Sequence, residues 1–230
     1  MGPSTNTDSN GHENFYSVEE LILLLEKQYG PFRWVQRYEP ITELIYTILS
    51  QHTSDLNSER AGNILLNRFG SWEAVTEAPL TMIEETIRPA GLSKQKAPRI
   101  KGALQTILGL RGALNLDFLA GLPLEEAKAW LRQLPGVGPK TTAIVLCFAF
   151  GMPAMPVDTH IHRVTKRLGL ISSKVSADQA HDLLEPMVPP NKIFSFHMGL
   201  IMHGRATCKA LRPRCRDCVL RIKCPSKMFN

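Results

Sequence analysis

Apolar residues recur along this chain three and four positions apart, and no segment alternates convincingly between apolar and polar residues. This pattern predicts an all-α fold. Helices are expected at about residues 17–29, 41–50, 55–69, 72–77, 81–88, 94–110, 123–133, 139–150, 158–168, 176–187 and 191–205. Thr81 with Glu84, and Ser176 with Gln179, have the spacing of N-terminal capping boxes. The connections are short, so any two lobes should be packed together.

The first sixteen residues differ from the rest. Met1–Glu13 is rich in Ser, Asn, Thr and Gly and has neither a basic nor an apolar stretch, so residues 1–16 are expected to form a disordered tail and not a targeting peptide. No apolar run approaches the roughly 18 residues that span a bilayer. We expect a monomer without a membrane partner, located in the cytoplasm of a prokaryotic cell and associated with its nucleoid.

Charge is distributed unevenly along the chain. The net charge is +6 over 230 residues, but the segment from Arg205 to Asn230 carries eight basic residues against Asp217 alone, so the remainder is nearly neutral. A basic segment on a neutral body is the electrostatic pattern of a protein that binds a phosphate backbone. A solvated charged tail would explain this segment alone equally well.

A glycine-rich turn lies between two predicted helices, in the sequence Leu134-Pro135-Gly136-Val137-Gly138-Pro139-Lys140. Gly136 and Gly138 allow a tight turn, and Pro139 suits the first position of the next helix. Such a turn exposes backbone N–H groups to a phosphate, because no side chain blocks close approach. A generic helical hairpin would account for the glycines as well.

Lys140 and Asp158 are the candidate catalytic residues. An ammonium in the first turn of a helix faces the positive end of the helix dipole, which disfavours its charged form, and partial burial would act in the same direction. A lysine that is partly neutral can act as a nucleophile and form a Schiff base. Asp158 follows eighteen residues later in Val157-Asp158-Thr159-His160-Ile161, where it is expected to cap a helix. A carboxylate fixed there could also serve a nearby amine or a developing sugar cation.

Four cysteines near the C-terminus have the spacing C-x6-C-x2-C-x5-C, namely Cys208, Cys215, Cys218 and Cys224. Nothing in the sequence indicates the oxidising compartment that disulfides need, so we expect a metal site. Four-cysteine zinc sites usually present two C-x2-C pairs, and this segment has one. Four thiolates suit a [4Fe-4S] cluster. The fifth cysteine, Cys147, lies in an apolar helix and is expected to be a core thiol.

The hairpin at 134–140, followed by Val157–Arg163, resembles the helix-hairpin-helix and aspartate signature of the endonuclease III family of DNA repair enzymes, and the cysteine spacing resembles that of its iron–sulfur cluster. The similarity extends over about residues 18–226. It implies that Lys140 attacks the anomeric carbon of a damaged nucleoside. Asp158 would activate the lysine and stabilise an oxocarbenium-like transition state. Relatives that only remove the base lack this lysine, so its presence favours an enzyme that also cleaves the backbone.

The same resemblance implies a two-lobed fold. Residues 41–155 would form a helical barrel domain with the helix-hairpin-helix at about 123–150. Residues 17–40 and 156–230 would form a cluster domain with the cysteine loop at 208–224. The active site would lie in the cleft between them.

Two loops are expected to enter the base stack, because an enzyme that acts on a base in duplex DNA must flip the base out and fill the gap. Gly91-Leu92-Ser93-Lys94-Gln95-Lys96-Ala97 resembles the family's G-L-x-x-x-K-A loop, in which the leucine is the wedge, so Leu92 is the candidate. The other loop departs from the family's L-S-x-Q-x-x-D pattern. Here Leu49-Ser50-Gln51-His52-Thr53-Ser54-Asp55 places His52 where relatives have glutamine, with Gln51 one position earlier. Either residue could fill the gap, and Asp55 could cap the next helix.

The resemblance also implies that the loop around the cluster presents basic residues to DNA phosphates, and the candidates are the three arginines that flank the cysteines, Arg212, Arg214 and Arg216. They could instead offset the negative charge of a thiolate-rich cluster.

The sequence therefore predicts a DNA glycosylase with AP-lyase activity that excises oxidised or damaged pyrimidines. Its partner would be double-stranded DNA with a damaged base or an abasic site. A glycosylase for uracil or mismatched thymine shares the fold and is the alternative among enzymes. A non-catalytic iron–sulfur protein that binds DNA or senses redox state is the alternative of another class, although phosphate binding alone requires neither Lys140 nor Asp158.

Overall fold

The structure is a computed structural model that describes residues 16–228, so the expected tail lies outside the described residues apart from Tyr16. Within this range the chain is helical and contains no strand, which confirms the all-α prediction. The α-helices are α1 (Val18–Tyr29), α2 (Pro40–Ser50), α3 (Asp55–Phe69), α4 (Trp72–Glu77), α5 (Leu80–Thr86), α6 (Ser93–Arg111), α7 (Leu124–Leu131), α8 (Pro139–Phe150), α9 (Thr159–Arg167), α10 (Ala177–Leu184) and α11 (Ile193–Ala206). Short 3-10 turns lie at Arg88–Ala90, Asp117–Gly121, Glu185–Met187, Pro190–Lys192 and Cys215–Asp217. None of the described helices is long and apolar enough to cross a membrane.

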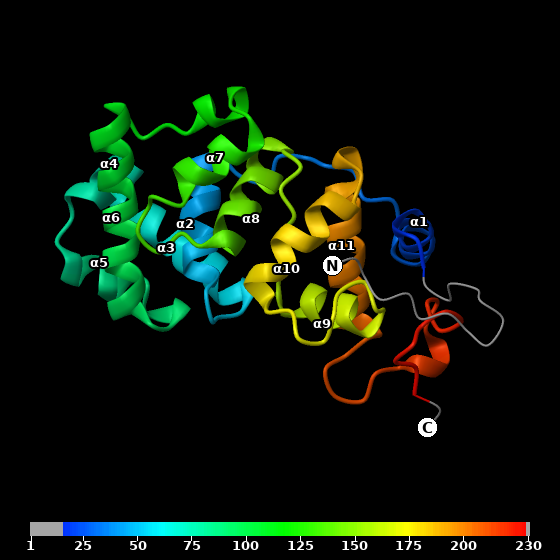
Figure 1. Ribbon diagram of the computed structural model, residues 1–230. Coiled ribbons are helices and arrows are strands. Elements are labelled where there is room, and N and C mark those ends of the chain that lie inside the picture. The colour runs from blue at the N-terminus through cyan, green and yellow to red at the C-terminus, as the bar shows by residue number, and fades with distance from the viewer. Residues whose placement is uncertain (1–15, 229–230) are drawn as a thin grey trace. The chain divides into compact units, whose positions relative to one another are not determined.

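The described chain divides into two compact units (Figure 1). Residues 35–152, with helices α2 to α8, form one unit, which we call the hairpin unit. The described residues before 35 and those from 153 onward, with α1 and α9 to α11, form the other, which we call the cysteine unit.

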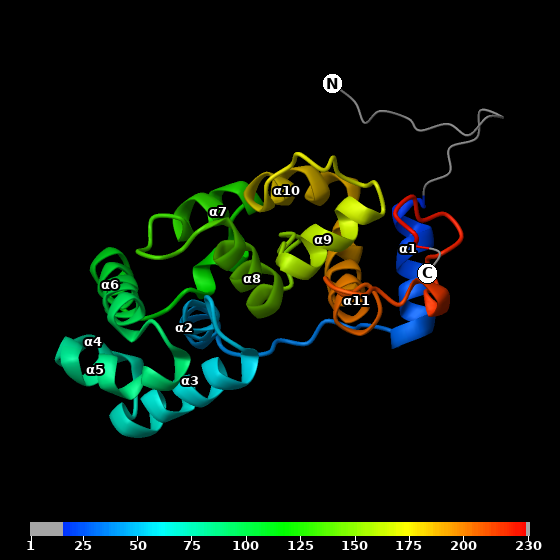
Figure 2. The ribbon, with the colours of Figure 1, turned by 90° about the horizontal axis from the view of Figure 1, so that it is seen from below.

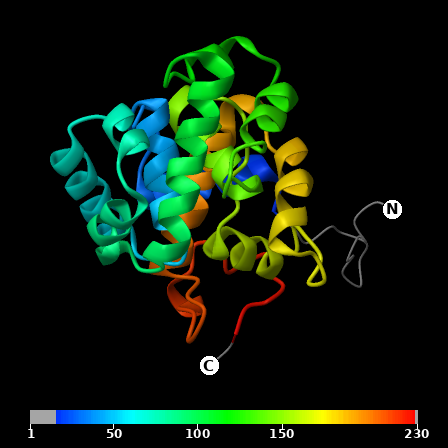
Figure 3. The same ribbon diagram turned by 90° about the vertical axis from the view of Figure 1, so that its left-hand side faces the viewer.

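Helix α2 is the centre of the hairpin unit. Nearly all of its residues are buried, as expected for a helix surrounded by others. It packs against α3, α6 and α8, and Figures 1 and 2 show it among these neighbours. The long helix α6, in front in Figure 3, also packs against α4 and α5.

The cysteine unit is organised around α11. Helices α1 and α9 both pack against it, and α10 packs against α9. The buried residues Phe196 and Leu200 of α11 are in the core of this unit. The chain then leaves α11 at Ala206 and enters the segment that carries the four cysteines.

Local sequence accounts for most helix ends. The predicted capping box at Ser176 and Gln179 is confirmed, because each side chain accepts from the other's backbone N–H. The capping box predicted at Thr81 is wrong. Helix α5 begins one residue earlier, at Leu80 after Pro79, and has no side-chain cap.

Candidate functional site

The glycine turn connects α7 to α8 in the hairpin unit. Gly136 has φ +77°, in the left-handed region that favours glycine, and a Cβ atom there would lie 2.7 Å from Cδ of Arg99. Gly138 is the N-cap residue of α8, has open space around it and provides no capping side chain. The first turn of α8 is therefore suited to an anion, because backbone N–H groups at an uncapped helix start can donate to it.

Lys140 is the second residue of α8 and its side chain is exposed. The partial burial that the sequence analysis considered for this amine is therefore not observed. An exposed amine beside an uncapped helix start can reach a ligand that is bound there.

Gln51 is held within the hairpin unit. Its Nε2 donates to the carbonyl of Gly136 at 3.0 Å and to Thr141 Oγ1 at 3.3 Å. Its Oε1 accepts from Arg99 Nη1 at 3.1 Å. The side chain therefore ties the loop after α2 to the glycine turn, and to enter the base stack it would have to break all three hydrogen bonds.

His52 has a different environment. It is exposed and adopts φ +55°, which costs a residue with a Cβ atom roughly 1 kcal/mol or more. The next helix, α3, is capped by Ser54, whose hydroxyl accepts from Asn57 N, so the cap expected at Asp55 is wrong. The structure presents His52 at the tip of this loop.

Leu92 also has a left-handed backbone, with φ +49°, and is 47% exposed at the start of α6. Apart from glycine, only His52, Leu92 and Arg212 adopt positive φ among the described residues. All three are candidate DNA contacts. Strained backbone at exposed positions is typical of functional sites, because the surrounding structure must hold it in place.

Asp158 lies in the cysteine unit and caps α9, as predicted. Its Oδ1 accepts from the N–H of Ile161 at 2.7 Å. No described residue donates to Oδ2, so one carboxylate oxygen has the capacity to bind another group.

Three residues that the sequence analysis missed hold the segment before Asp158. Glu185 Oε2 accepts from Met155 N at 3.0 Å. Nδ1 of His181 lies 2.8 Å from the carbonyl of Met155, and Nδ1 of His197 lies 3.0 Å from that of Pro156. A helical side chain gives no sequence signal for a bond to a distant backbone group. These contacts fix the chain from which Asp158 projects.

The four cysteines line one pocket of the cysteine unit, together with Arg167, His203 and Leu220. Burial, and then the neighbouring thiols, raise the pKa of Cys218 to about 11. Burial therefore favours the uncharged form of this thiol, and a bound cation would favour the thiolate. Among the described residues no three His, Cys, Asp or Glu side chains converge on a single ion, whereas the ligands of a four-iron cluster bind separate irons and need not converge on one point. The pocket therefore brings together four thiols, the donor set of a metal or iron–sulfur site.

Two polar side chains reach the cysteine sulfurs. Arg167 Nη1 donates to Cys208 Sγ at 3.3 Å, and His203 Nε2 lies 3.6 Å from Cys218 Sγ. Arg167 also donates to the carbonyls of Lys209 and Ala210. The guanidinium that contacts a cysteine sulfur therefore comes from α9 and not from the arginines between the cysteines, for which the sequence analysis had considered this role.

Arg212, Arg214 and Arg216 are all exposed. Nη2 of Arg214 lies 3.2 Å from Asp217 Oδ2, so this guanidinium already has a carboxylate partner. Arg212 and Arg216 form no ion pair with a described residue, which makes them better phosphate candidates than Arg214. By contrast, Cys147 is confirmed as a core thiol, because its side chain is buried and burial raises its pKa to about 12.

Comparison with known proteins decides the family. The HhH-GPD superfamily of base excision DNA repair proteins matches residues 45–190. Endonuclease III of Thermotoga maritima is 31% identical over 207 residues, which cover 90% of this chain and 92% of that protein. The chain belongs to the endonuclease III family.

Solved structures of family members agree with this assignment. A non-covalent endonuclease III–DNA complex matches with a TM-score of 0.77 and 28% identity, over 91% of this chain and 94% of that one. A thermostable thymine-DNA glycosylase matches with a TM-score of 0.73 and 26% identity. An Arabidopsis thaliana relative, named as a proposed DNA glycosylase, is 36% identical over 168 residues, and the chain spans 57% of its length.

Proposed function

We propose that this chain is a base excision DNA glycosylase with AP-lyase activity, in which Lys140 is the nucleophile and Asp158 the acidic partner. The observation that carries the proposal is the placement of Lys140. In a member of the endonuclease III family, an exposed amine stands at the uncapped start of α8, directly after the glycine turn. A phosphate bound by that turn would bring the adjacent nucleoside within reach of the amine.

The chemistry follows from these groups. The neutral amine of Lys140 attacks C1′ of the damaged nucleoside, the C1′–N bond breaks, and the base leaves with the bonding electrons and takes up a proton. Asp158 takes part by accepting the lysine's proton and by stabilising the positive charge on the sugar ring. The nitrogen lone pair then forms the C1′=N bond as the C1′–O4′ bond breaks, O4′ takes up a proton, and the opened sugar is held as a protonated imine. Removal of a C2′ proton then expels the 3′ phosphate by β-elimination, and water releases the lysine.

Oxidised pyrimidines are the proposed substrates. The alternative is uracil or mismatched thymine, and one specific observation favours keeping it: the thermostable thymine-DNA glycosylase matches over 91% of this chain. His52 occupies the position where the family pattern has glutamine. Its imidazole differs in chemistry from that amide, and it lies in the loop that is proposed to fill the gap.

The cofactor proposed for the cysteine unit is a [4Fe-4S] cluster, held by Cys208, Cys215, Cys218 and Cys224. Four iron–thiolate bonds would fix a segment that has little apolar core of its own. Arg167 and His203 would then donate to ligand sulfurs, and hydrogen bonds to sulfur are one means by which a protein adjusts a cluster's reduction potential.

The test is excision on a set of duplexes that each contain one defined lesion, with borohydride added to trap the imine. We expect trapping with the wild type and its loss in Lys140→Ala, at unchanged DNA affinity. Lys94→Ala is the matched control, because Lys94 is likewise the exposed second residue of a helix. Trapping at the wild-type rate by Lys140→Ala would refute the assignment. Excision of uracil or mismatched thymine in preference to oxidised pyrimidines would select the alternative substrate.

A further inference from the structure

Lys96 is a buried lysine in the hairpin unit that the proposed mechanism does not use. It lies on α6, and only 1% of its surface is exposed. Nζ donates to the carbonyl of Leu49 at 2.6 Å and to that of Ala90 at 2.7 Å. No described carboxylate forms an ion pair with it. Burying an amine is costly unless its hydrogen bonds are made, so these two carbonyls are the reason that the side chain is stable there.

The two carbonyls lie where two different loops begin. Leu49 lies in the last turn of α2, where helix carbonyls lack partners within the helix. Ala90 ends the 3-10 turn before α6. His52 follows Leu49 by three positions and Leu92 follows Ala90 by two, and both have left-handed backbones. The backbone N–H of Lys96 also donates to the carbonyl of Leu92 at 2.9 Å.

We propose that Lys96 is a positioning residue that fixes the loops of His52 and Leu92 relative to each other, so that both side chains enter the base stack in one arrangement. The proposal rests on the proposed function, because it assumes that these loops fill the gap left by a flipped base. Two side chains that fill one gap must keep their separation. A single amine that donates to a carbonyl at the start of each loop sets that separation.

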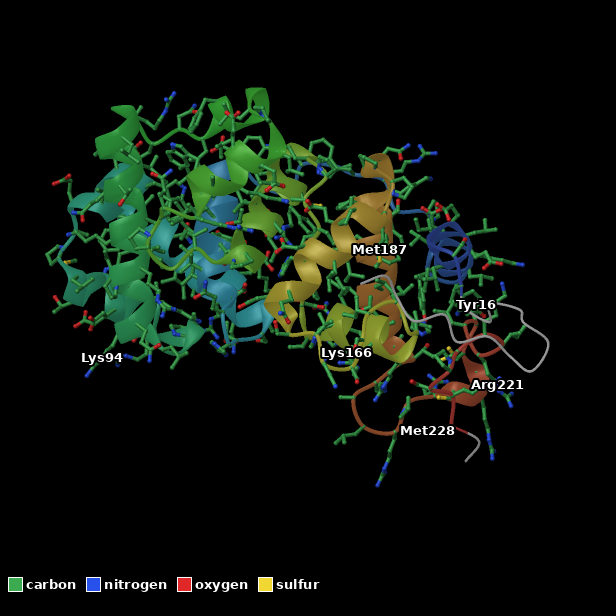
Figure 4. The ribbon with its side chains drawn as sticks, in the orientation of Figure 1. Tyr16, Lys94, Lys166, Met187, Arg221 and Met228 are labelled. Carbon is green, nitrogen blue, oxygen red and sulfur yellow. The ribbon has the colours of Figure 1, made fainter. Side chains whose placement is uncertain are left out.

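Lysine suits this role because its amine has three donors on a long apolar stem. An apolar side chain of similar length would fill the space but leave both carbonyls without a partner. Burial lowers the pKa of Lys96 to about 8, and the neutral amine still has two N–H groups, one for each carbonyl. Figure 4 labels Lys94, two residues earlier, whose side chain instead points away from α6.

The experiment compares Lys96→Met with Lys101→Met. Lys101 also lies on α6 and donates to a helix-end carbonyl, that of Ala78 at 2.6 Å, but this contact lies away from both loops. A duplex with 2-aminopurine next to an abasic-site analogue reports unstacking by a rise in fluorescence, and melting temperatures report stability. A second substrate, an abasic site in single-stranded DNA, requires no gap to be filled.

We expect Lys96→Met to lose most of the fluorescence rise and at least tenfold in kcat/KM on duplex lesions, while its cleavage of the single-stranded abasic site stays within twofold of wild type. Lys101→Met should lower the melting temperature and leave the fluorescence rise unchanged. A normal fluorescence rise in Lys96→Met would overturn the proposal. An equal loss on both substrates would do so too, because it would indicate general damage to the fold.

If Lys96→Met does not fold, Lys96→Gln replaces it. Glutamine keeps donors on a shorter side chain that cannot reach both carbonyls, so the same selective loss is expected, and normal unstacking would overturn the proposal. Failure of the proposed function has a different signature: wild-type protein that unstacks the duplex but neither excises a lesion nor cleaves an abasic site.

Discussion

Two parts of the molecule are stabilised in different ways: the glycine turn at residues 134–140, and residues 208–228, which we call the cysteine segment. Helix α8, which follows the turn, has eight buried residues, and it packs against α2 and α7. In the segment 208–228, Leu220 is the only buried residue that the structure describes. Apolar burial therefore stabilises the turn, whereas the cysteine segment must be stabilised by other interactions.

Polar contacts provide part of the stability of the cysteine segment. Lys223 pairs with Glu20 at 2.8 Å, and its backbone N–H donates to the hydroxyl of Tyr16. Figure 4 shows Tyr16 close to this segment, which also carries Arg221. Exposed ion pairs contribute little to stability, about 1 kcal/mol or less, so the proposed cluster would have to provide most of the remainder. The hairpin unit has its own apolar core, whereas the cysteine segment is predicted to depend on the proposed bound group.

Loss of a cysteine ligand should have the largest effect. Cys218→Ser should yield little soluble protein, because the segment loses its fixed point and has almost no core. Cys147→Ala is the control in the hairpin unit, and it should stay soluble with about four iron and four sulfide per chain, at a cost of roughly 1–2 kcal/mol. Iron and sulfide analysis of protein made under iron-replete, anaerobic conditions checks this. Stoichiometric zinc without iron would contradict it.

Asp158→Asn should separate catalysis from helix capping. Asparagine also caps helices, so the melting temperature should change little, while the glycosylase rate falls about 100-fold. The control is Ser176→Ala, which removes a cap of α10 and should cost about 1 kcal/mol of stability without loss of activity. Single-turnover excision and thermal melting together test this, and full activity in Asp158→Asn would leave Asp158 with a structural role only.

The buried Lys96 should make the stability of the hairpin unit depend on pH. The pKa of Lys96 is lowered from 10.5 to about 8, so between these values the unfolded chain binds more protons than the folded one. The free energy of unfolding of wild type, relative to Lys96→Met, should therefore rise with pH from about 8 to 10.5, by at most ~1.4 kcal/mol per pH unit. The two carbonyls that accept from Lys96 do not titrate, so they add no pH dependence of their own. Denaturant titrations across this range measure the slope, and a fall with pH would contradict the lowered pKa.

Gln51 and His52 should respond differently to substitution. Gln51→Ala removes three hydrogen bonds within the hairpin unit and should cost about 1–3 kcal/mol of stability, with equal loss of activity opposite all four bases. His52→Gln should change the ratio of activities opposite guanine and adenine several-fold, since His52 is exposed at the loop tip. Excision of one lesion opposite each base tests both. A preference that moves only with Gln51 would assign the gap-filling role to Gln51.

The smallest expected effect concerns the arginines of the cysteine segment. Replacing Arg212 or Arg216 with alanine should reduce the slope of log affinity against log salt by about one unit each. Arg214→Ala should change it less, because Asp217 already pairs with Arg214. Titrations at several salt concentrations measure this, and three unchanged slopes would place the phosphate contacts elsewhere.

The sequence predicted the helices well, because the spacing of apolar residues is a local signal and proline and glycine mark many helix ends. The candidate residues in motifs, such as Lys140 and Asp158, were also found from local spacing. The contacts of Gln51 with Gly136, of Lys96 with Leu49 and of His197 with Pro156 were not, because each joins residues more than 40 positions apart in the chain. Hydrogen bonds from a side chain to a distant carbonyl have no characteristic spacing. The structure was needed to show that Gln51 is held internally and that His52 is exposed.

The most direct test of the central claim is to identify the residue that becomes bound to DNA. Wild-type protein is reacted with lesion-containing duplex and borohydride, digested, and analysed by mass spectrometry. The account predicts one adduct, on Nζ of Lys140, and none on the exposed Lys94. An adduct on any other amine, with Lys140 unmodified, would contradict it.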